Sequence, residues 1–371
     1  MIDELFRKDL AEFSPYKAEI KKARVVLDAN ESFLNIPANL QEELLAEIRG
    51  IDYNRYPDPF SIKLCEEFLR YIGQEYLGSG DLGTEYLGID IKNIIAGNGS
   101  DELISMIISA FAQQGDKVLI PTPNFSMYKI YSKVSGAIPV EYPTSEEFKL
   151  DVNNFIAKVN EEKAKIVFIS NPNNPTGGVI PLYELIKIID GCNSIVVIDE
   201  AYGEFYGKTL VDKILRFDNL IILKTCSKMG MAAIRLGFLL TNERLMEEIK
   251  KVKPPYNLNS VTQTIGYFML YHREAIKDAV NKIILEREYL YKELSAINLI
   301  TIFPSQANFI LIKVPEADKT YEMLLQNNVS VRNFKDDLLK DYFRITVGSR
   351  AENFWFISHL KSILKQIAEG K

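Results

Sequence analysis

A lysine, two hydroxyls and an arginine occur within eleven residues of one another, directly after an apolar segment. Thr225, Ser227, Lys228 and Arg235 follow residues 220–223, a run typical of a buried parallel strand. In an open α/β sheet, ligands bind outside the carboxyl ends of the strands. A lysine that is partly desolvated there loses proton affinity and becomes a usable amine nucleophile. The hydroxyls and the guanidinium suit a phosphate, although a surface lysine after a strand is the simpler alternative.

Other polar groups come at the ends of two further apolar runs. Asp199 ends residues 195–198, where an ionised carboxylate is costly to bury without a cationic partner. A protonated pyridine nitrogen would be such a partner, and the ring would then work as an electron sink. Tyr202 and the amide of Asn171, which follows residues 165–170, could each hydrogen-bond a ring hydroxyl. A salt bridge or helix cap is the alternative for Asp199, and an ordinary half-buried tyrosine is the alternative for Tyr202.

Residues 94–103 predict a short strand, a glycine turn and then a helix. Ser100 is expected at the N-cap of that helix, with Asp101 beside it. Free backbone N–H groups and the helix dipole make such an N-terminus an anion site, although a well-capped helix needs no ligand. A second glycine-rich segment, residues 78–83, matches G-x-G-x-x-G but follows a helical stretch. We therefore predict a surface connection there, since the dinucleotide fingerprint must follow a strand.

Strands that alternate with helices must position these groups, and this alternation predicts a mostly parallel, doubly wound α/β sheet. Residues 253–256, Lys-Pro-Pro-Tyr, are the best domain boundary. We expect residues 1–38 to form an arm associated with the small domain, residues 39–255 the large domain, and residues 256–371 the smaller α+β domain. The expected strands are 25–27, 117–121, 140–142, 165–170, 194–200, 220–223, 236–240, 308–313, 329–332 and 342–347. The expected helices are 39–49, 61–76 after a cap at Ser61, one after Ser100, one from Met127, 182–190, one or two within 259–296, 318–327 and 351–367.

Composition excludes several classes of protein. The net charge of −6 and the scattered basic residues argue against a nucleic-acid binder. The three cysteines, Cys65, Cys192 and Cys226, lack metal spacing and indicate a reducing compartment. With two histidines in the chain, we expect no metal site. No apolar run approaches the roughly 18 residues of a membrane span, and the charged N-terminus lacks a signal-peptide core. A cytoplasmic location is expected.

Three segments together resemble the pyridoxal-phosphate (PLP) aminotransferases of fold type I. They are Asn-Pro-Asn-Asn-Pro-Thr-Gly at 171–177, Asp-Glu-Ala-Tyr at 199–202, and Ser-Lys at 227–228 with Arg235. The resemblance implies that fold and PLP as cofactor. It also implies that Lys228 carries the Schiff base and that Asp199 pairs with the pyridinium. The residues that would hold the cofactor phosphate are Ser100, Asp101, Ser227 and Arg235, and Phe125 would stack on the ring.

Nearly the whole chain is similar to the histidinol-phosphate aminotransferases. The matching segments are residues 27–32, 54–59, 304–309, 331–332 and 343–348. In that family the tyrosine matching Tyr56 reaches the cofactor phosphate of the neighbouring subunit, which implies a homodimer with shared sites. The resemblance also implies that Tyr16, Arg332 and Arg344 bind the substrate phosphate, that Arg344 serves the cosubstrate carboxylates too, and that Asn30 contacts substrate.

The function expected from this resemblance is a step of histidine biosynthesis, with a small-molecule amino donor and a 2-oxo acid as partners. L-Histidinol phosphate and 2-oxoglutarate would give imidazole acetol phosphate and L-glutamate, and Lys228 would move the proton between Cα and C4′ of the cofactor. A threonine-phosphate decarboxylase and an aromatic aminotransferase share these motifs and remain alternatives. A non-catalytic PLP-fold module is a third alternative, against which the joint retention of Lys228, Asp199 and Asn171 argues.

Overall fold

Seven strands form the larger sheet of the computed structural model, which describes residues 2–7, 23–78 and 83–370. The strand order is β2-β8-β7-β6-β5-β3-β4, and β8 alone of these strands runs antiparallel to its neighbours. This arrangement confirms the predicted α/β class with a mostly parallel sheet. The strands are β2 (Ile94–Asn98), β3 (Lys117–Thr122), β4 (Ile138–Pro143), β5 (Ile166–Ser170), β6 (Ile195–Asp199), β7 (Leu220–Thr225) and β8 (Leu236–Thr241).

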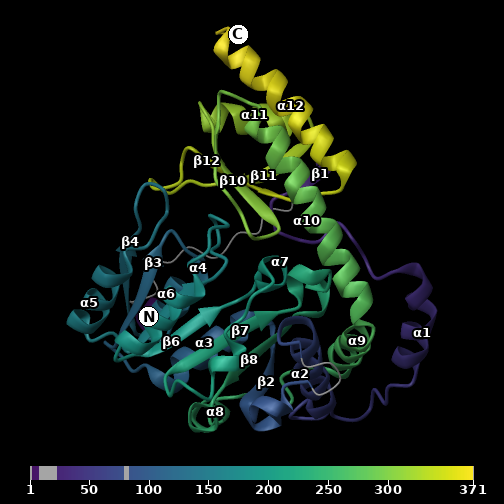
Figure 1. Ribbon diagram of the computed structural model, residues 1–371, viewed down its shortest axis with the longest axis vertical. Helices are drawn as coiled ribbons and strands as arrows, with labels where there is room; N and C mark the ends of the chain where they lie inside the picture. The colour runs from purple at the N-terminus through teal and green to yellow at the C-terminus, as the bar shows by residue number, and fades with distance from the viewer. Residues whose placement is uncertain (1, 8–22, 79–82, 371) are drawn as a thin grey trace.

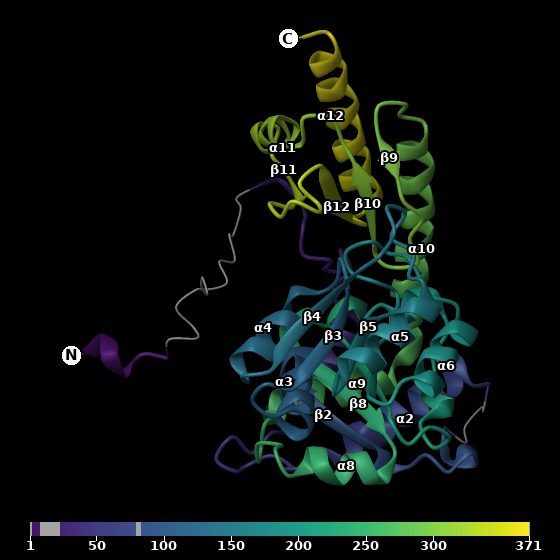
Figure 2. The same cartoon turned by 90° about the vertical axis from the view of Figure 1, so that its left-hand side faces the viewer.

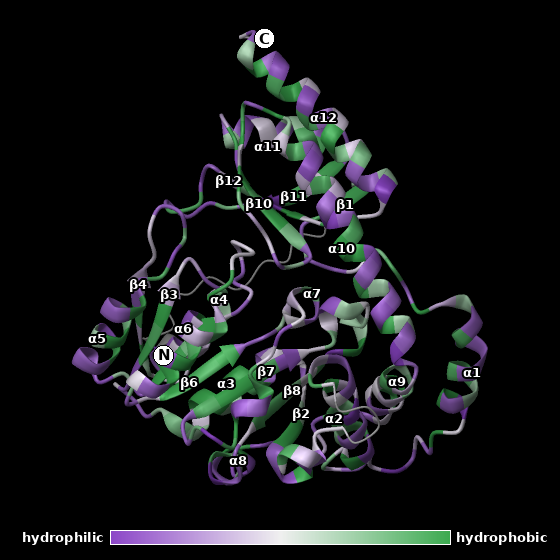
Figure 3. Cartoon of the chain, viewed as in Figure 1, coloured by the Kyte–Doolittle hydropathy of each residue, from purple (hydrophilic) through white to green (hydrophobic). Residues whose placement is uncertain are grey.

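Both faces of this sheet are covered, which explains why its central strands are mostly apolar. Every residue of β5, β7 and β8 is buried, and the strands appear as hydrophobic ribbons inside the molecule (Figure 3). One face packs against α3 (Gly99–Phe111), α4 (Ser126–Val134) and α8 (Glu243–Lys250). The other packs against α2 (Ile62–Tyr76), α5 (Val152–Glu162) and α6 (Leu182–Gly191). The pleat alternates side chains between these two layers.

A smaller sheet lies above the larger one in both views (Figures 1 and 2). Its strand order is β1-β11-β12-β10-β9, and the chain's first described strand joins it by pairing in parallel with β11. Three helices pack against this sheet: α10 (Arg273–Ser295), α11 (Ala317–Gln326) and α12 (Arg350–Ala368). The strands are β1 (Val25–Leu27), β9 (Thr301–Ile302), β10 (Phe309–Lys313), β11 (Val329–Asn333) and β12 (Tyr342–Thr346).

The predicted division of the chain into an arm and two domains stays a prediction. The pairing of β1 with β11 is compatible with an arm that belongs to the small domain. Helix α9 (Ser260–Tyr271), however, packs against α1 (Ala38–Arg49) and α2, on the side of the larger sheet. From there α10 runs up to the smaller sheet (Figure 1). By packing, the boundary would therefore follow α9 and not residue 255.

Two helix starts differ from the sequence-based prediction. Helix α3 begins at Gly99 after Asn98, so Ser100 lies in the first turn and not at the N-cap. Ser61 does precede α2, but its φ of 53° is left-handed and its hydroxyl caps nothing. The carboxylate of Asp58 accepts the Ile62 N–H at 2.7 Å instead. The sequence analysis also missed α5, α8 and the two-residue strand β9. Among the described residues, no helix is long and apolar enough to cross a membrane.

Candidate active site

The predicted site residues meet at one edge of the larger sheet. The parallel strands β2, β3, β5, β6 and β7 all end at this edge, and the antiparallel strand β8 begins there. Consequently the segments that follow these five parallel strands lie together with the segment that precedes β8. This is the edge at which ligands bind in open α/β sheets. The residues brought to this edge are Ser100 and Asp101 after β2, Phe125 after β3, Asn171 after β5, Asp199 at the end of β6, Ser227 and Lys228 after β7, and Arg235 before β8.

Lys228 lies in a 3-10 turn, Ser227–Met229, that ends at Gly230 with a left-handed φ of 95°. Its Nζ donates to the carbonyl oxygen of Ala29 at 3.4 Å. Burial, with smaller contributions from the positive charges of Arg344 and Arg235, lowers the pKa of Lys228 to about 8. Near neutral pH, a larger fraction of this amine is therefore neutral and nucleophilic than in an exposed lysine.

Asp199 is buried and held by two hydrogen bonds. One carboxylate oxygen accepts from the hydroxyl of Tyr128 at 2.6 Å, and the other accepts from the Ala201 N–H at 2.9 Å. Burial raises the pKa of Asp199 to about 6 although both hydrogen bonds oppose the shift. A cationic partner would stabilise the ionised form of this carboxylate. Phe125 meets Tyr128 edge-on, with ring centroids 5.6 Å apart, so one turn of α4 carries both aromatic rings of this corner.

Tyr128 is a site residue that sequence reasoning missed. It lies three positions after Phe125, the N-cap residue of α4, and their rings are in contact. That spacing was a usable signal, but nothing in the sequence tells that the hydroxyl reaches Asp199, which lies 71 residues further along the chain.

Arg235, Ser227 and Asp101 form a polar cluster at the start of α3. The Arg235 guanidinium lies 3.0 Å from Asp101 Oδ2 and donates to Ser227 Oγ at 3.5 Å. Gly99 beside it has a left-handed φ of 79°, which favours glycine, and a Cβ there would lie 2.6 Å from Arg235 Nη2. The cluster therefore joins a guanidinium, a hydroxyl and a helix N-terminus, which together favour an anion.

The asparagines of residues 171–174 have different surroundings. Asn171 accepts the Ile180 N–H at 2.7 Å, a contact that holds its own loop together. Asn174 accepts from Arg344 Nη1 at 2.6 Å. The role predicted for Asn171 stays a prediction, while Asn174 is a second asparagine of the same segment that the structure brings to a predicted substrate residue.

Asn30 links the N-terminal segment to both sheets. Its Nδ2 donates to the hydroxyl of Tyr202 at 2.9 Å, and its backbone N–H donates to Thr346 Oγ1 at 2.9 Å. Its carbonyl accepts from Asn308 Nδ2 at 3.0 Å. The left-handed φ of 55° at this residue aims the three groups in different directions. Burial raises the pKa of Tyr202, so its hydroxyl stays protonated.

Arg332 and Arg344 are directly opposite each other in the antiparallel pair of β11 and β12. Their two strands are therefore neighbours in the smaller sheet. Arg344 is partly buried and also donates to the Asp28 carbonyl at 2.7 Å, whereas Arg332 is exposed. Tyr56 is 81% exposed and stacks on Tyr256, with ring centroids 4.6 Å apart. Tyr16 lies outside the described residues.

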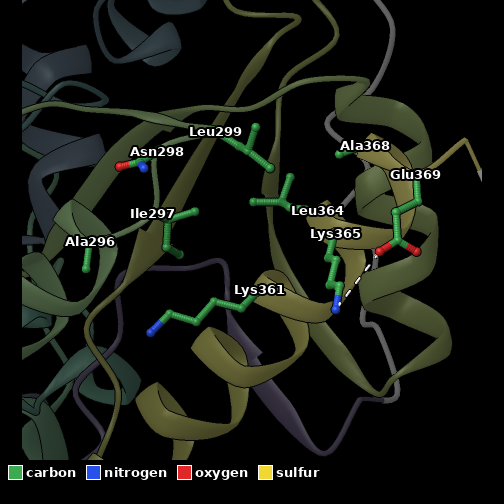
Figure 4. Close-up of a pocket in the computed structure, with 9 residues that line it drawn as sticks. All are labelled: Ala296, Ile297, Asn298, Leu299, Lys361, Leu364, Lys365, Ala368 and Glu369. Carbon is green, nitrogen blue, oxygen red and sulfur yellow. Dashed lines mark ion pairs between the residues drawn. The ribbon is translucent and has the colours of Figure 1, made fainter.

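A surface groove of about 470 Å³ lies away from this site, between residues 296–299 and the last turns of α12 (Figure 4). Its lining includes Ile297, Leu299, Leu364 and Lys365, and none of the predicted site residues.

Comparison with known proteins agrees with the fold. The model of the family described as aminotransferase class I and II matches residues 24–360, so the chain belongs to a family of PLP-dependent aminotransferases. The histidinol-phosphate aminotransferase of Clostridium novyi is 46% identical over 362 residues, which cover 97% of this chain and 98% of that protein. Within its class, the chain belongs to the family of histidinol-phosphate aminotransferases.

Solved structures give the same result. The histidinol-phosphate aminotransferase from Clostridium acetobutylicum has a TM-score of 0.80 and 26% identity, and the match covers 92% of this chain and 99% of that one. The enzyme from Sinorhizobium meliloti, solved with pyridoxal-5'-phosphate, has a TM-score of 0.82 and 19% identity over 96% and 98% of the two chains. At that identity the second likeness shows the fold alone. The fold-type-I prediction is confirmed.

Proposed function

We propose that this enzyme transfers the amino group of L-histidinol phosphate to 2-oxoglutarate with bound PLP, in histidine biosynthesis. The identity of 46% to a histidinol-phosphate aminotransferase over nearly the full chain supports the reaction. The observation that carries the choice of substrate is the pair of arginines, Arg332 and Arg344, directly opposite each other on neighbouring strands.

The residues at the sheet edge fit PLP by their chemistry. Lys228 supplies an amine of lowered pKa for the cofactor's aldehyde. Asp199 supplies a buried carboxylate that pairs with no cation in the part of the chain that the structure describes, and the Arg235 cluster supplies an anion site. When bound, the cofactor supplies an electron sink for the carbanion at Cα.

The chain's own groups then have separate tasks. Lys228 accepts the proton from Cα of the substrate and returns it on the cofactor's side, as a general base that becomes a general acid. Asp199, oriented by Tyr128, keeps the ring nitrogen protonated. Tyr202 and Asn171 or Asn174 would orient the ring hydroxyl of the bound cofactor, and Phe125 would cover the ring face. Asn30 fixes the Tyr202 hydroxyl from the N-terminal segment.

The arginine pair supports a phosphate-bearing substrate on electrostatic grounds. Residues directly opposite on an antiparallel pair share one face, and like charges placed there repel. A dianionic phosphate between two guanidiniums removes the repulsion and accepts several charge-assisted hydrogen bonds. Arg344, which contacts Asn174 and lowers the pKa of Lys228, is the arginine that would also receive the carboxylates of 2-oxoglutarate.

A steady-state assay with L-histidinol phosphate, phenylalanine and phosphothreonine tests the proposal. We expect kcat/KM to be highest for L-histidinol phosphate with 2-oxoglutarate as acceptor. Release of carbon dioxide from phosphothreonine, or a higher kcat/KM for phenylalanine, would refute it in favour of a decarboxylase or an aromatic aminotransferase.

The variant Arg332→Lys should weaken the transition state for L-histidinol phosphate by about 1.5–3 kcal/mol, the scale of a hydrogen bond to a charged group. The effect on 2-oxoglutarate should be smaller, while Arg344→Lys should impair both half-reactions. The measurement is kcat/KM for histidinol phosphate relative to histidinol. Lys335→Gln, which removes an exposed cation paired with Asp318, is the matched control and should change neither value. An unchanged preference for the phosphate in Arg332→Lys would rule out its phosphate-binding role.

A homodimer with shared active sites is supported by exposed large apolar side chains close to Tyr56 in the sequence and by Tyr256, which stacks on Tyr56. A monomer rarely exposes large apolar side chains together, so such a group favours a protein partner. The exposed residues of this group are Tyr53, Tyr56, Phe60, Ile62 and Tyr256.

The three cysteines, all buried and free, support a reducing compartment such as the cytoplasm.

Tyr56 should act on the active site of the partner subunit. A Tyr56→Phe protein and a Lys228→Ala protein should each be impaired, and mixing them should restore activity, because one of the two sites in a hybrid dimer carries neither change. The readout is turnover after subunit exchange, followed by mass spectrometry of the mixed dimers. Mixed dimers that form without any gain in turnover would place Tyr56 outside the partner's site.

A further inference from the structure

Lys224 is a charged residue in the middle of an apolar layer. It lies in β7, it is 1% exposed, and the pleat turns it away from the face that carries α3 and α4. Its Nζ lies 3.1 Å from Glu200 Oε2 and 3.5 Å from Glu204 Oε1, and 4.5 Å from the centroid of the Tyr76 ring. Both glutamates are buried as well. We refer to Lys224, Glu200 and Glu204 as the buried ionic cluster.

Lys224 stays charged in its buried place. Burial alone would lower the pKa of Lys224, but the two carboxylates outweigh burial and raise it above its ordinary value. Glu200 is further held by the Thr209 hydroxyl at 2.6 Å and by the Leu210 N–H at 2.8 Å. A Cβ on Gly203 would lie 3.2 Å from Lys224 Nζ, so the backbone of α7 (Gly203–Tyr206) packs close to the ammonium.

Each member of the cluster is covalently close to a residue of the proposed site. Glu200 follows Asp199, Glu204 comes two residues after Tyr202, and Lys224 precedes Lys228 by four residues. Glu200 begins the short link from β6 to α7, and α7 lies beside the end of β7 (Figure 1). Displacing Lys224 would leave two carboxylates buried without their cation, which is strongly unfavourable. The ionic contacts therefore oppose relative movement of the segments that carry Asp199, Tyr202 and Lys228.

We propose that Lys224, Glu200 and Glu204 are positioning residues. They hold Asp199, Tyr202 and Lys228 in the relative positions that catalysis needs, from the face of the sheet opposite α3 and α4. This inference rests on the proposed function. Buried ion pairs are a poor source of stability, because desolvation offsets their attraction and uncharged replacements are often as stable. Apolar side chains of the same volume would fill this part of the core but would not hold the site residues in alignment. Alignment of the site is therefore the role that we assign to the buried ionic cluster.

The test is the triple variant Lys224→Met/Glu200→Gln/Glu204→Gln, which removes all three charges with little change of shape. We expect the cofactor-free protein to unfold at or above the wild-type temperature. In the loaded enzyme, kcat should fall about 10- to 100-fold, the scale of a small misplacement of catalytic groups, with little change in either KM. The visible circular dichroism of the bound cofactor should change, because it depends on how the ring is held. Lys224→Arg should retain nearly wild-type kcat and spectrum.

Two further variants support the test of the triple variant. Lys117→Met/Glu162→Gln removes an ion pair of 2.6 Å at the amino end of β3, far along the strand from the site, and should change neither kcat nor the spectrum. If the triple variant does not fold, Glu204→Gln alone should still lower kcat and alter the dichroism. A folded triple variant, or a folded Glu204→Gln, with wild-type kcat and dichroism would overturn the positioning role. Absence of cofactor binding in the wild-type protein would instead refute the proposed function itself.

Discussion

Lys228→Ala should lower kcat by about 10⁴-fold or more, because the variant loses both the amine for the cofactor's aldehyde and the group that moves the proton at Cα. The structure gives the reason why this lysine suits both tasks. Burial and two neighbouring arginines bring its pKa to about 8, so it can exist as a free amine and can also carry a proton near neutral pH. The purified wild-type protein should absorb in the near-visible region and respond to an amine donor.

The measurement for Lys228→Ala combines the absorption spectrum with turnover. The variant should retain PLP weakly at best, and its spectrum should lack the band of lysine-bound cofactor. Lys250→Ala, which removes an exposed lysine of α8 paired with Glu247, is the control and should behave as wild type. A colourless wild-type protein in the presence of PLP, or a Lys228→Ala protein with normal turnover, would contradict the assignment.

Asp199→Asn should bind PLP yet lower kcat by about 100-fold or more, since losing a charge-assisted hydrogen bond alone amounts to roughly 3 kcal/mol and the ring nitrogen would also lose its proton. The asparagine can still accept the Ala201 N–H on its Oδ1, and its Nδ2 can donate to the Tyr128 hydroxyl oxygen, so the local structure should persist. The measurement is kcat together with the dissociation constant of PLP.

Tyr128→Phe is the matched variant for Asp199. It removes only the hydroxyl that orients the carboxylate, so its effect on kcat should be in the same direction and smaller than that of Asp199→Asn. Near-normal activity of Asp199→Asn would mean that the carboxylate has only a structural role.

The sequence was sufficient for groups that follow from local pattern. Apolar runs predicted the strands, and the rule that ligands bind at the carboxyl ends of parallel strands put Lys228, Asp199 and Asn171 at one edge. The prediction of Ser100 as the N-cap was inaccurate, because several residues near a glycine turn can begin a helix. In the structure α3 begins at Gly99. Lys224 of β7 is another residue whose place the sequence did not explain. In the sequence it is only a polar residue next to Thr225.

What the sequence by itself determined is therefore the fold class, the order of the strands along the chain and the residue types at their ends, because helical and strand periodicity depend on neighbours within a few positions. Only the tertiary structure decided which of these ends meet. Tyr128 bonds to Asp199, Asn30 to Tyr202, and Arg344 to Asn174, over separations of 71, 172 and 170 residues. Such pairs depend on the order of strands in the sheets and on the register of β11 against β12, and local periodicity carries no information about either.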